Sequence, residues 1–330
     1  MDTLKKIDLF DFTLHNGVNK RWLSLYYQVF GQPIGTAPVV LVNHALTGNS
    51  QVTGQNGWWT SLIGPDAVID TGFYTVIAFN IPGNGYDGNT ESLIHNYRDF
   101  TTKDIARIFW EGLQFLGIKQ LFAVIGGSLG GGIAWEMTLL QPENIRHLIP
   151  IAADWKATDW LIANVLVQDK ILNNSDNPVH DARLHAMLLY RTPQSLKQKF
   201  DRTKNETQSI YQIESWLLHH GEKLKGRFQL ASYKLMNHLL KTIGEDLNCG
   251  SFLRLGKETK AQIHIVAVDS DYFFTAAENK ETYEILKRVK EDVYYHEIQS
   301  IHGHDAFLIE FEQLNNILKH IFITTKQTIQ

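Results

Sequence analysis

The sequence predicts an α/β fold, in which a mostly parallel, doubly wound sheet carries an inserted helical cap. Three observations predict it. Short runs rich in Val, Ile and Phe alternate with helical patterns along most of the chain, as they do in βαβ units. These runs are almost continuously apolar, which indicates strands buried on both faces of a parallel sheet. Between Trp155 and Gly250 the alternation stops, and amphipathic helical patterns with aromatic and Leu anchors replace it.

Each expected element follows from one of these patterns, taken in chain order. Residues 9 to 30 predict an antiparallel hairpin at one edge of the sheet. The expected strands are Pro38–Ala45, Tyr74–Asn80, Leu121–Gly127, His147–Ala153, Ile263–Asp269 and the more polar, alternating Val293–Ser300. The expected helices of the core are Lys103–Leu116, Leu129–Leu140, Ala276–Val289 and Asp305–Ile321.

The same patterns divide the chain of 330 residues into three segments. Residues 1–154 form the first part of the core, residues 155–250 the helical cap, and residues 251–330 the second part of the core. Because the cap pattern stands between two core strands, we expect an insertion that lies over the sheet.

Composition excludes several classes of protein. A formal net charge of −4 disfavours nucleic-acid binding, which needs a concentrated positive field. The single cysteine, Cys249, excludes a disulfide framework and a zinc cluster built on cysteines. The N-terminus lacks the apolar segment of a signal peptide, and no apolar run approaches the ~20 residues that span a bilayer. We therefore expect a cytoplasmic protein without membrane contact and without a resident metal or cofactor.

The strongest local motif is Gly126-Gly127-Ser128-Leu129-Gly130, at the junction of an expected strand and an expected helix. This is the G-x-S-x-G nucleophile elbow in its required strand–turn–helix context. The glycines allow a tight turn with close backbone approach, and the turn presents the Ser128 hydroxyl at a helix N-terminus. A glycine-rich helix start that only packs is the alternative. The flanking strand and helix favour a nucleophile.

A serine hydroxyl needs a base and an orienting carboxylate, which follow the nucleophile in the order acid, then histidine, in this type of site. Asp271 lies 143 residues after Ser128, in a loop that follows a strand, and His304 lies 33 residues further on, after the last strand. Asp269 and His302 are the competing candidates. Asp269 closes the strand itself and is expected to brace the loop, whereas His304 directly precedes a helix. The loop positions favour Asp271 and His304.

An oxyanion hole completes such a site. One donor is the backbone N–H after the nucleophile, that of Leu129. The second is expected from the loop Asn43–Gly48, where Leu46 presents its amide and Thr47 is placed to hydrogen-bond a substrate. For His44 in the same loop, a bracing role is favoured over catalysis.

Several stretches together resemble the homoserine O-acyltransferase family, and they are distributed from about residue 40 to residue 310. These stretches are NHALTGNSQVTGQNGWWTSLIGPDAVIDTGFYTVIAFN, VIGGSLGGGIAWEM, ESWLLHHGEKLKGRFQLASY, SDYFF and HGHDAFL. Two segments depart from the family pattern, namely Asn80–Gly88 and the RFQLASY stretch Arg227–Tyr233. Both are expected around the substrate pockets, so they bear on the substrate more than on the triad.

The resemblance implies an α/β-hydrolase fold and an acetyltransferase of methionine biosynthesis, with acetyl-CoA as co-substrate and homoserine as acceptor. It implies Ser128, Asp271 and His304 as the catalytic triad. Arg191 and Asp305 correspond by position to residues that hold the amino-acid substrate, since arginine grips a carboxylate and aspartate receives an ammonium group. The resemblance also favours a homodimer. The alternative is a carboxylic-ester hydrolase that uses the same triad on water.

Overall fold

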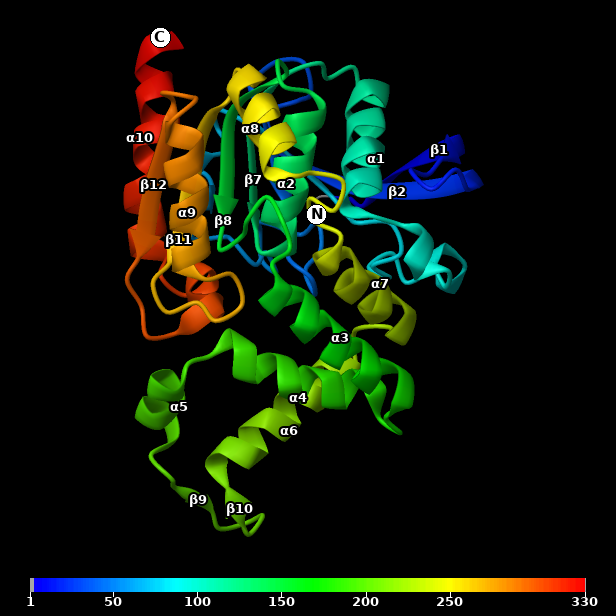
Figure 1. Cartoon of the computed structure of the whole chain (residues 1–330), viewed down its shortest axis with the longest axis vertical. Helices are drawn as coiled ribbons and strands as arrows, with labels where there is room; N and C mark the ends of the chain where they lie inside the picture. Colours follow the sequence, from blue (N-terminus) through cyan, green and yellow to red (C-terminus); the bar gives the residue numbers. More distant parts are fainter. Residues whose placement is uncertain (1–2, 330) are drawn as a thin grey trace.

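The computed structural model describes residues 3–329, and its centre is an eight-stranded sheet (Figure 1). The strand order is β1-β2-β6-β3-β7-β8-β11-β12. Six neighbouring strands are parallel to one another, namely β6, β3, β7, β8, β11 and β12. Strand β1 pairs with β2, and β2 with β6, in antiparallel fashion. The predicted α/β fold with a doubly wound, mostly parallel sheet is therefore confirmed, and its antiparallel hairpin lies at the expected edge.

The elements have the following bounds. The sheet contains β1 (Lys5–Thr13), β2 (Asn19–Gly31), β3 (Val39–Asn43), β6 (Thr75–Phe79), β7 (Leu121–Gly127), β8 (Ile145–Ile151), β11 (Gln262–Val268) and β12 (Val293–Ile298). Two-residue strands are β4 (Ile63–Gly64), β5 (Ile69–Asp70), β9 (Lys204–Asn205) and β10 (Ile210–Tyr211). The α-helices are α1 (Thr102–Phe115), α2 (Leu129–Leu140), α3 (Asp159–Asn174), α4 (Pro178–Tyr190), α5 (Pro193–Phe200), α6 (Gln212–Lys225), α7 (Leu230–Lys241), α8 (Cys249–Glu258), α9 (Ala276–Lys287) and α10 (Phe311–Ile329), and the 3₁₀ helices are η1 (Thr90–Ser92), η2 (Tyr97–Asp99) and η3 (Gly303–Leu308).

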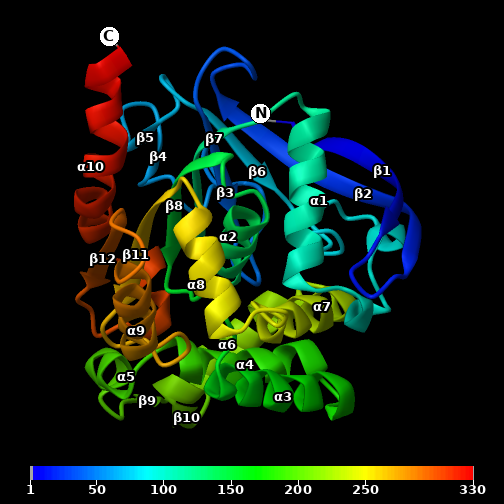
Figure 2. The same cartoon turned by 45° about the horizontal axis from the view of Figure 1, so that its top comes forward.

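Two hydrophobic layers cover the two faces of the sheet (Figure 2). One layer packs α1, α2, α8 and α9 against the strands, with the buried Trp135 and Phe252 rings edge to face between α2 and α8. The other layer is formed by α10 and by the segment between β3 and β6, where Tyr74, Phe122 and Phe322 are in mutual contact. Burial on both faces explains why the central strands are apolar throughout.

The last predicted helix of the core is wrong in its beginning. The sequence predicts a single helix over Asp305–Ile321, but residues 303–308 form the 3₁₀ helix η3 and α10 begins only at Phe311. The aromatic ring of Phe307 turns into the core here, T-shaped against Trp59, and the Trp59 indole donates to the Phe307 carbonyl. Because the Phe307 carbonyl accepts from Trp59, it is not available for the hydrogen bond that a continuous α-helix would need. Strand β8 also begins two residues earlier than predicted.

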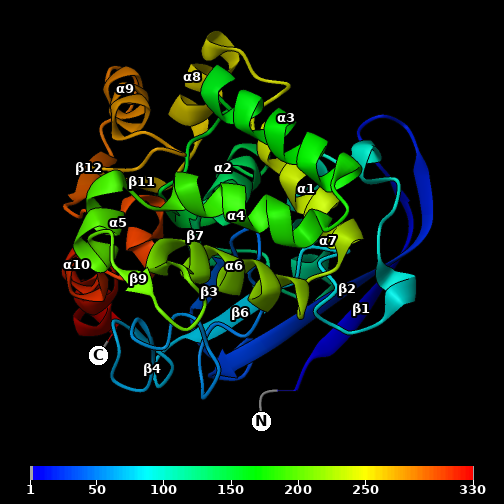
Figure 3. The same cartoon turned by 90° about the horizontal axis from the view of Figure 1, so that it is seen from below.

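Helices α3 to α7 lie between β8 and β11 in the chain and together form the cap (Figure 3). Strand β7 ends at Gly127, directly before Ser128, and the cap helices lie over this end of the sheet. Helix α8, which the sequence patterns do not predict, follows the cap and returns to the core layer. No helix within residues 3–329 combines the length and apolar character needed to cross a membrane.

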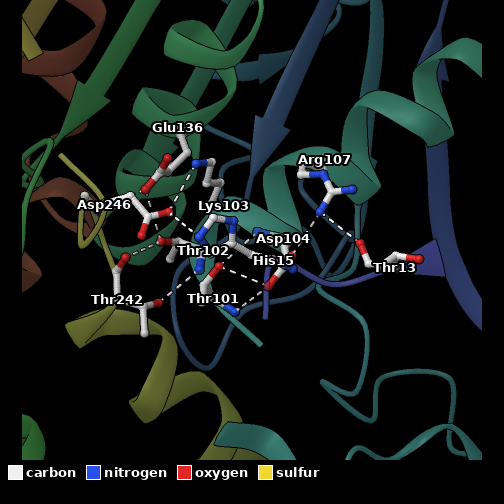
Figure 4. A network of polar contacts seen from close by, with 11 residues as sticks. Thr13, His15, Thr101, Thr102, Lys103, Asp104, Arg107, Glu136, Thr242 and Asp246 are labelled. Atoms are coloured by element: carbon white, nitrogen blue, oxygen red, sulfur yellow. Dashed lines mark hydrogen bonds and ion pairs between the residues drawn. The ribbon is translucent and has the colours of Figure 1, made fainter. Parts of the chain in front are cut away.

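A polar network ties α1, α2, the end of the cap and the N-terminal hairpin together (Figure 4). Glu136 on α2 accepts a hydrogen bond from the Gly244 amide, and Asp246 pairs with both Lys103 and His15. Glu136 is almost fully buried, and burial raises the pKa of its carboxyl to about 7. The network therefore holds a group that changes charge near neutrality.

Candidate active site

Ser128 lies in the tight turn between β7 and α2. Its backbone has φ 56° and ψ −125°, a combination that a residue with a side chain adopts only under constraint. A Cβ at Gly126 would overlap the Gly130 backbone, and a Cβ at Gly130 would overlap the Asn43 carbonyl. The two glycines therefore let strand, turn and helix approach closely, and this approach sets Ser128 at the N-terminus of α2.

Ser128, His304 and Asp271 form a continuous hydrogen-bonded chain. His304 Nε2 lies 2.9 Å from Ser128 Oγ, and His304 Nδ1 lies 2.7 Å from Asp271 Oδ2. Because a carboxylate only accepts, Nδ1 carries the ring proton and Nε2 is free to accept from the serine hydroxyl. All three residues are buried. This arrangement can transfer a proton from the serine to the histidine.

Asp271 is held by the backbone of the next residues. Its Oδ1 accepts hydrogen bonds from the amides of Phe273, at 2.6 Å, and Phe274, at 3.0 Å. These bonds leave Oδ2 directed at the imidazole and compensate the buried negative charge.

The two competing residues of the sequence analysis lie elsewhere in the loops. Asp269 Oδ1 accepts from the Ser300 amide, so it joins the β11 and β12 loops. His302 lies against Ser195 and Arg191, at 3.0 and 3.1 Å. His304 and Asp271 are therefore the histidine and the carboxylate that the structure brings to Ser128.

Aromatic rings enclose the His304 imidazole. Phe274 stacks on it, and Phe273, Phe307 and Tyr190 pack around it with ring centroids 5.1 to 5.6 Å away. Such a wall excludes water and strengthens the electrostatic interactions inside it.

The backbone amides of Leu46 and Leu129, which the sequence predicts as the oxyanion hole, both flank the expected site, and their role stays a prediction. Leu129 begins α2, and Leu46 is buried in the loop after β3. Neither amide has a hydrogen-bond partner in the part of the chain that the structure describes. His44 fixes the Leu46 loop, since its ring bonds the Ala45 carbonyl at 2.8 Å and accepts from the Ile81 amide at 3.0 Å. Burial lowers the pKa of His44 to about 4, so the ring is a neutral brace near pH 7.

The residues expected to bind substrate lie around the same centre. Arg191 donates to Ser195 Oγ at 2.7 Å, and its Nη1 lies 3.9 Å from Asp305 Oδ2. Asp305 directly follows His304, and burial raises the pKa of its carboxyl. The Thr47 carbonyl accepts from Arg227 at 3.0 Å, which links the loop after β3 to the cap.

Arg183 is a candidate site residue that the sequence patterns do not reveal. It lies on α4 with its guanidinium 5.4 Å from the Tyr190 ring. Among the charges that lower the pKa of Asp305, that of Arg183 is the largest, ahead of those of His304 and Arg191. No hydrogen bond or ion pair holds its guanidinium within residues 3–329. In the sequence it resembles any exposed charge on an amphipathic helix, so only the packing of α4 identifies it.

The described residues contain no group of three or more His, Cys, Asp or Glu side chains that could hold a metal ion. The chemistry that this geometry supports is nucleophilic attack by Ser128 with proton transfer through His304.

Comparisons with known proteins agree with this reading of the fold. A family model described as the alpha/beta hydrolase fold matches residues 38–243. A homoserine O-acetyltransferase of Cyclobacterium marinum is 32% identical over 306 residues, which cover 86% of this chain and 85% of the relative. The crystal structure of homoserine O-acetyltransferase from Bacillus anthracis superposes with a TM-score of 0.86 at 18% identity, over 97% of each chain. The crystal structure of esterase E22 superposes with the same TM-score at 16% identity, over 98% of this chain and 100% of the esterase.

The fold and the comparisons define an α/β hydrolase in the structural sense. The two solved structures, at identities below 20%, show the shared fold alone. The sequence relatives are more specific. The chain belongs to the homoserine O-acetyltransferase family and is an enzyme of that type.

Proposed function

We propose that this enzyme transfers an acetyl group from acetyl-CoA to the hydroxyl of L-homoserine through an acyl-Ser128 intermediate, a step of methionine biosynthesis. The observation that carries the proposal is the chain Ser128–His304–Asp271 beside two unpartnered amides. The names of the sequence relatives support homoserine as the acceptor.

The first half-reaction acylates the serine. His304 Nε2 takes the Ser128 proton while Oγ attacks the thioester carbonyl, and Asp271 stabilises the imidazolium that forms. The Leu46 and Leu129 amides donate to the oxyanion; removing one such donor typically costs about 3–4 kcal/mol of transition-state stabilisation. The carbon–sulfur bond then breaks, and the CoA thiolate leaves with the proton held by His304.

The second half-reaction passes the acetyl group on. The acceptor hydroxyl attacks the acetyl carbon and gives its proton to His304 Nε2. The bond to Ser128 Oγ breaks, and Oγ regains a proton from the imidazolium. Water can follow the same path, so the cap has to exclude water and position the alcohol.

The charged groups beside His304 suit an amino-acid acceptor. Asp305 can receive the α-ammonium group, and an arginine can grip the α-carboxylate. Arg191 is the arginine predicted from the sequence, but its guanidinium is already engaged by Ser195 and His302. The positive charge of Arg183 lowers the pKa of the Asp305 carboxyl, and no hydrogen bond or ion pair engages the Arg183 guanidinium within residues 3–329. We therefore place Arg183 at the carboxylate and Arg191 as the residue that orients Asp305 and the His302 loop.

Kinetics of two arginine variants separate these roles. We expect Arg183→Lys to raise the KM for homoserine at least tenfold, because Lys lacks the bidentate fork, and to leave the single-turnover thiol release that acylates Ser128 unchanged. Arg191→Lys should lower kcat more than it raises this KM. The reverse pattern would show that Arg191, and not Arg183, binds the α-carboxylate of homoserine.

The function itself is tested by thiol release from acetyl-CoA with and without L-homoserine. Release that requires homoserine, yields an O-acetylated product by mass and vanishes in Ser128→Ala supports the transferase. Equal release without acceptor indicates a hydrolase. No release from acetyl-CoA, with Ser128-dependent cleavage of simple esters, would retain the triad and overturn the homoserine assignment.

A further inference from the structure

A surface cavity of about 430 Å³ lies where the cap meets the core, in the size range of small-ligand pockets. Helices α3 and α7 and the short helix η2 line it, and we call it the α3–α7 groove. Its lining residues are Tyr97, Arg98, Ile162, Val165, Leu166, Asp169, Lys170, Asn237, His238 and Lys241.

The groove combines an apolar floor with a positive rim. Three permanent cations line it (Arg98, Lys170 and Lys241), and all three are exposed. The one carboxylate, Asp169, is engaged by the Tyr97 hydroxyl at 3.0 Å and lies 3.7 Å from Arg98. Burial lowers the pKa of His238 to about 4, so this imidazole adds no positive charge near pH 7. Such a lining suits a ligand with a flat apolar ring and several phosphate charges.

A small void shares lining residues with both the groove and the aromatic wall around His304, and we call its lining residues Val165, Gln168 and Asn237 the seam. Val165 and Asn237 line the groove and also this void of about 10 Å³, room for about one water. The void is also lined by Leu46, whose amide is one of the oxyanion donors proposed above, and by Tyr190 and Phe273, which pack on His304.

The seam presents an unused hydrogen-bond acceptor. The amide nitrogen of Gln168 bonds the Ala182 carbonyl and His185, but Gln168 Oε1 is buried without a partner in the described part of the chain. Gln168 as a whole is 5% exposed and lines the void. A buried acceptor without a donor is costly, so a ligand that brings an N–H group into the seam would be favoured.

We propose that the α3–α7 groove binds the phosphate-bearing nucleotide end of the acyl-CoA donor, and that the donor's amide-containing arm reaches Ser128 along this seam. The inference rests on the proposed function, because it takes acyl-CoA as the donor. The Asn237 side chain donates a hydrogen bond to the Val165 carbonyl within the seam. The proposal requires this bond to open and the void to widen when the arm enters. The donor then comes from the α3–α7 side, and Arg183, Arg191 and Asp305 remain for the acceptor.

Direct binding tests the groove independently of turnover. The probe is adenosine 3′,5′-bisphosphate, titrated calorimetrically into the full chain at low salt. We expect the unmodified protein to bind it and Lys170→Glu/Lys241→Glu to bind at least tenfold more weakly, because phosphate contacts are charge contacts. Lys223→Glu on α6 is the matched control and should bind like the unmodified protein. Absence of binding to the unmodified protein, or equal weakening in the control, would overturn the proposal that the α3–α7 groove binds the nucleotide end of the donor.

Kinetics then test the link to the reaction. The double variant should raise the KM for acetyl-CoA at least tenfold while kcat and the hydrolysis of p-nitrophenyl acetate, which lacks the nucleotide, stay within twofold. The ester rate also reports correct folding. If the unmodified enzyme turns over acetyl-CoA and the double variant has the same KM for it, the groove is not the donor site, and the proposed function stands. If the unmodified enzyme never releases thiol from acetyl-CoA, the proposed function fails, and the donor route fails with it.

Discussion

Asp271 orients His304 through one carboxylate oxygen while two backbone amides hold the other. In Asp271→Asn, the Phe273 and Phe274 amides still require an acceptor, so the side-chain oxygen stays with them and the new NH₂ group faces His304. The imidazole must then present an acceptor at Nδ1 and a proton at Nε2, which is the wrong tautomer for a base. We expect kcat to fall by about 10³–10⁴ with little change in Tm. Thiol release and thermal unfolding measure the two effects; a drop below tenfold would contradict the orienting role.

Glu136 makes stability depend on pH. The pKa of its carboxyl is about 7 in the folded protein and near the ordinary value of 4.5 in the unfolded chain. The folded state therefore holds a proton that the unfolded state has lost, and the free energy of unfolding falls as pH rises from about 4.5 to 7. Glu136→Gln keeps the acceptor for the Gly244 amide without the charge. We expect it to be more stable than the unmodified protein by about 1–3 kcal/mol at pH 8 and by little at pH 5.

Thermal unfolding at the two pH values checks this difference. Glu143→Gln is the control, because Glu143 is exposed near the end of the same helix. An equal gain at both pH values would show that the effect of Glu136→Gln does not come from a buried charge.

At the scale of elements, the contact between α2 and β3 sets the geometry of the elbow. A Cβ at Gly130 would overlap the carbonyl oxygen of Asn43, and the backbone would have to move to relieve the overlap. We expect Gly130→Ala to lose about 1–3 kcal/mol of stability and about 10² in kcat, because the Leu129 amide shifts. Gly226→Ala is the control, since Gly226 is in a right-handed conformation and a Cβ there would make only ordinary van der Waals contacts. Unfolding and ester hydrolysis measure both variants; normal activity in Gly130→Ala would show that the elbow tolerates displacement.

The helices and strands also show which boundaries can be predicted from sequence patterns. Strand β7 and helix α2 have the predicted ends, because the continuous apolar run and the glycine-rich turn are local signals. The beginning of α10 was missed because Phe307 and the Trp59 indole hold residues 303–308 in a 3₁₀ turn, and the sequence gives no local sign of that contact. Arg183 was missed for a similar reason. Asp305, whose carboxyl pKa the Arg183 charge lowers, lies on the other side of the cap–core boundary, 122 residues away in the chain.

For the whole molecule, a homodimer remains a prediction. Helix α3 leaves Trp160 and Val167 about half exposed, and these apolar side chains would be covered by a second copy. We expect sedimentation velocity to give a dimer at micromolar concentration and Val167→Asp to shift it toward monomer. A monomeric unmodified chain would contradict the prediction, and Val18→Asp on the distant hairpin turn controls for a general loss of solubility.

The position of the cap in the chain has a consequence for folding. Strands β8 and β11 are neighbours in the sheet, yet the chain between their paired ends makes a loop of about 110 residues. Joining them directly from an open chain is entropically expensive. If the cap helices collapse on one another first, the two strands are brought near each other and the remaining loop is much shorter. The cap would thus act as a template during synthesis, with the last two strands and α10 completing the sheet only after it has formed.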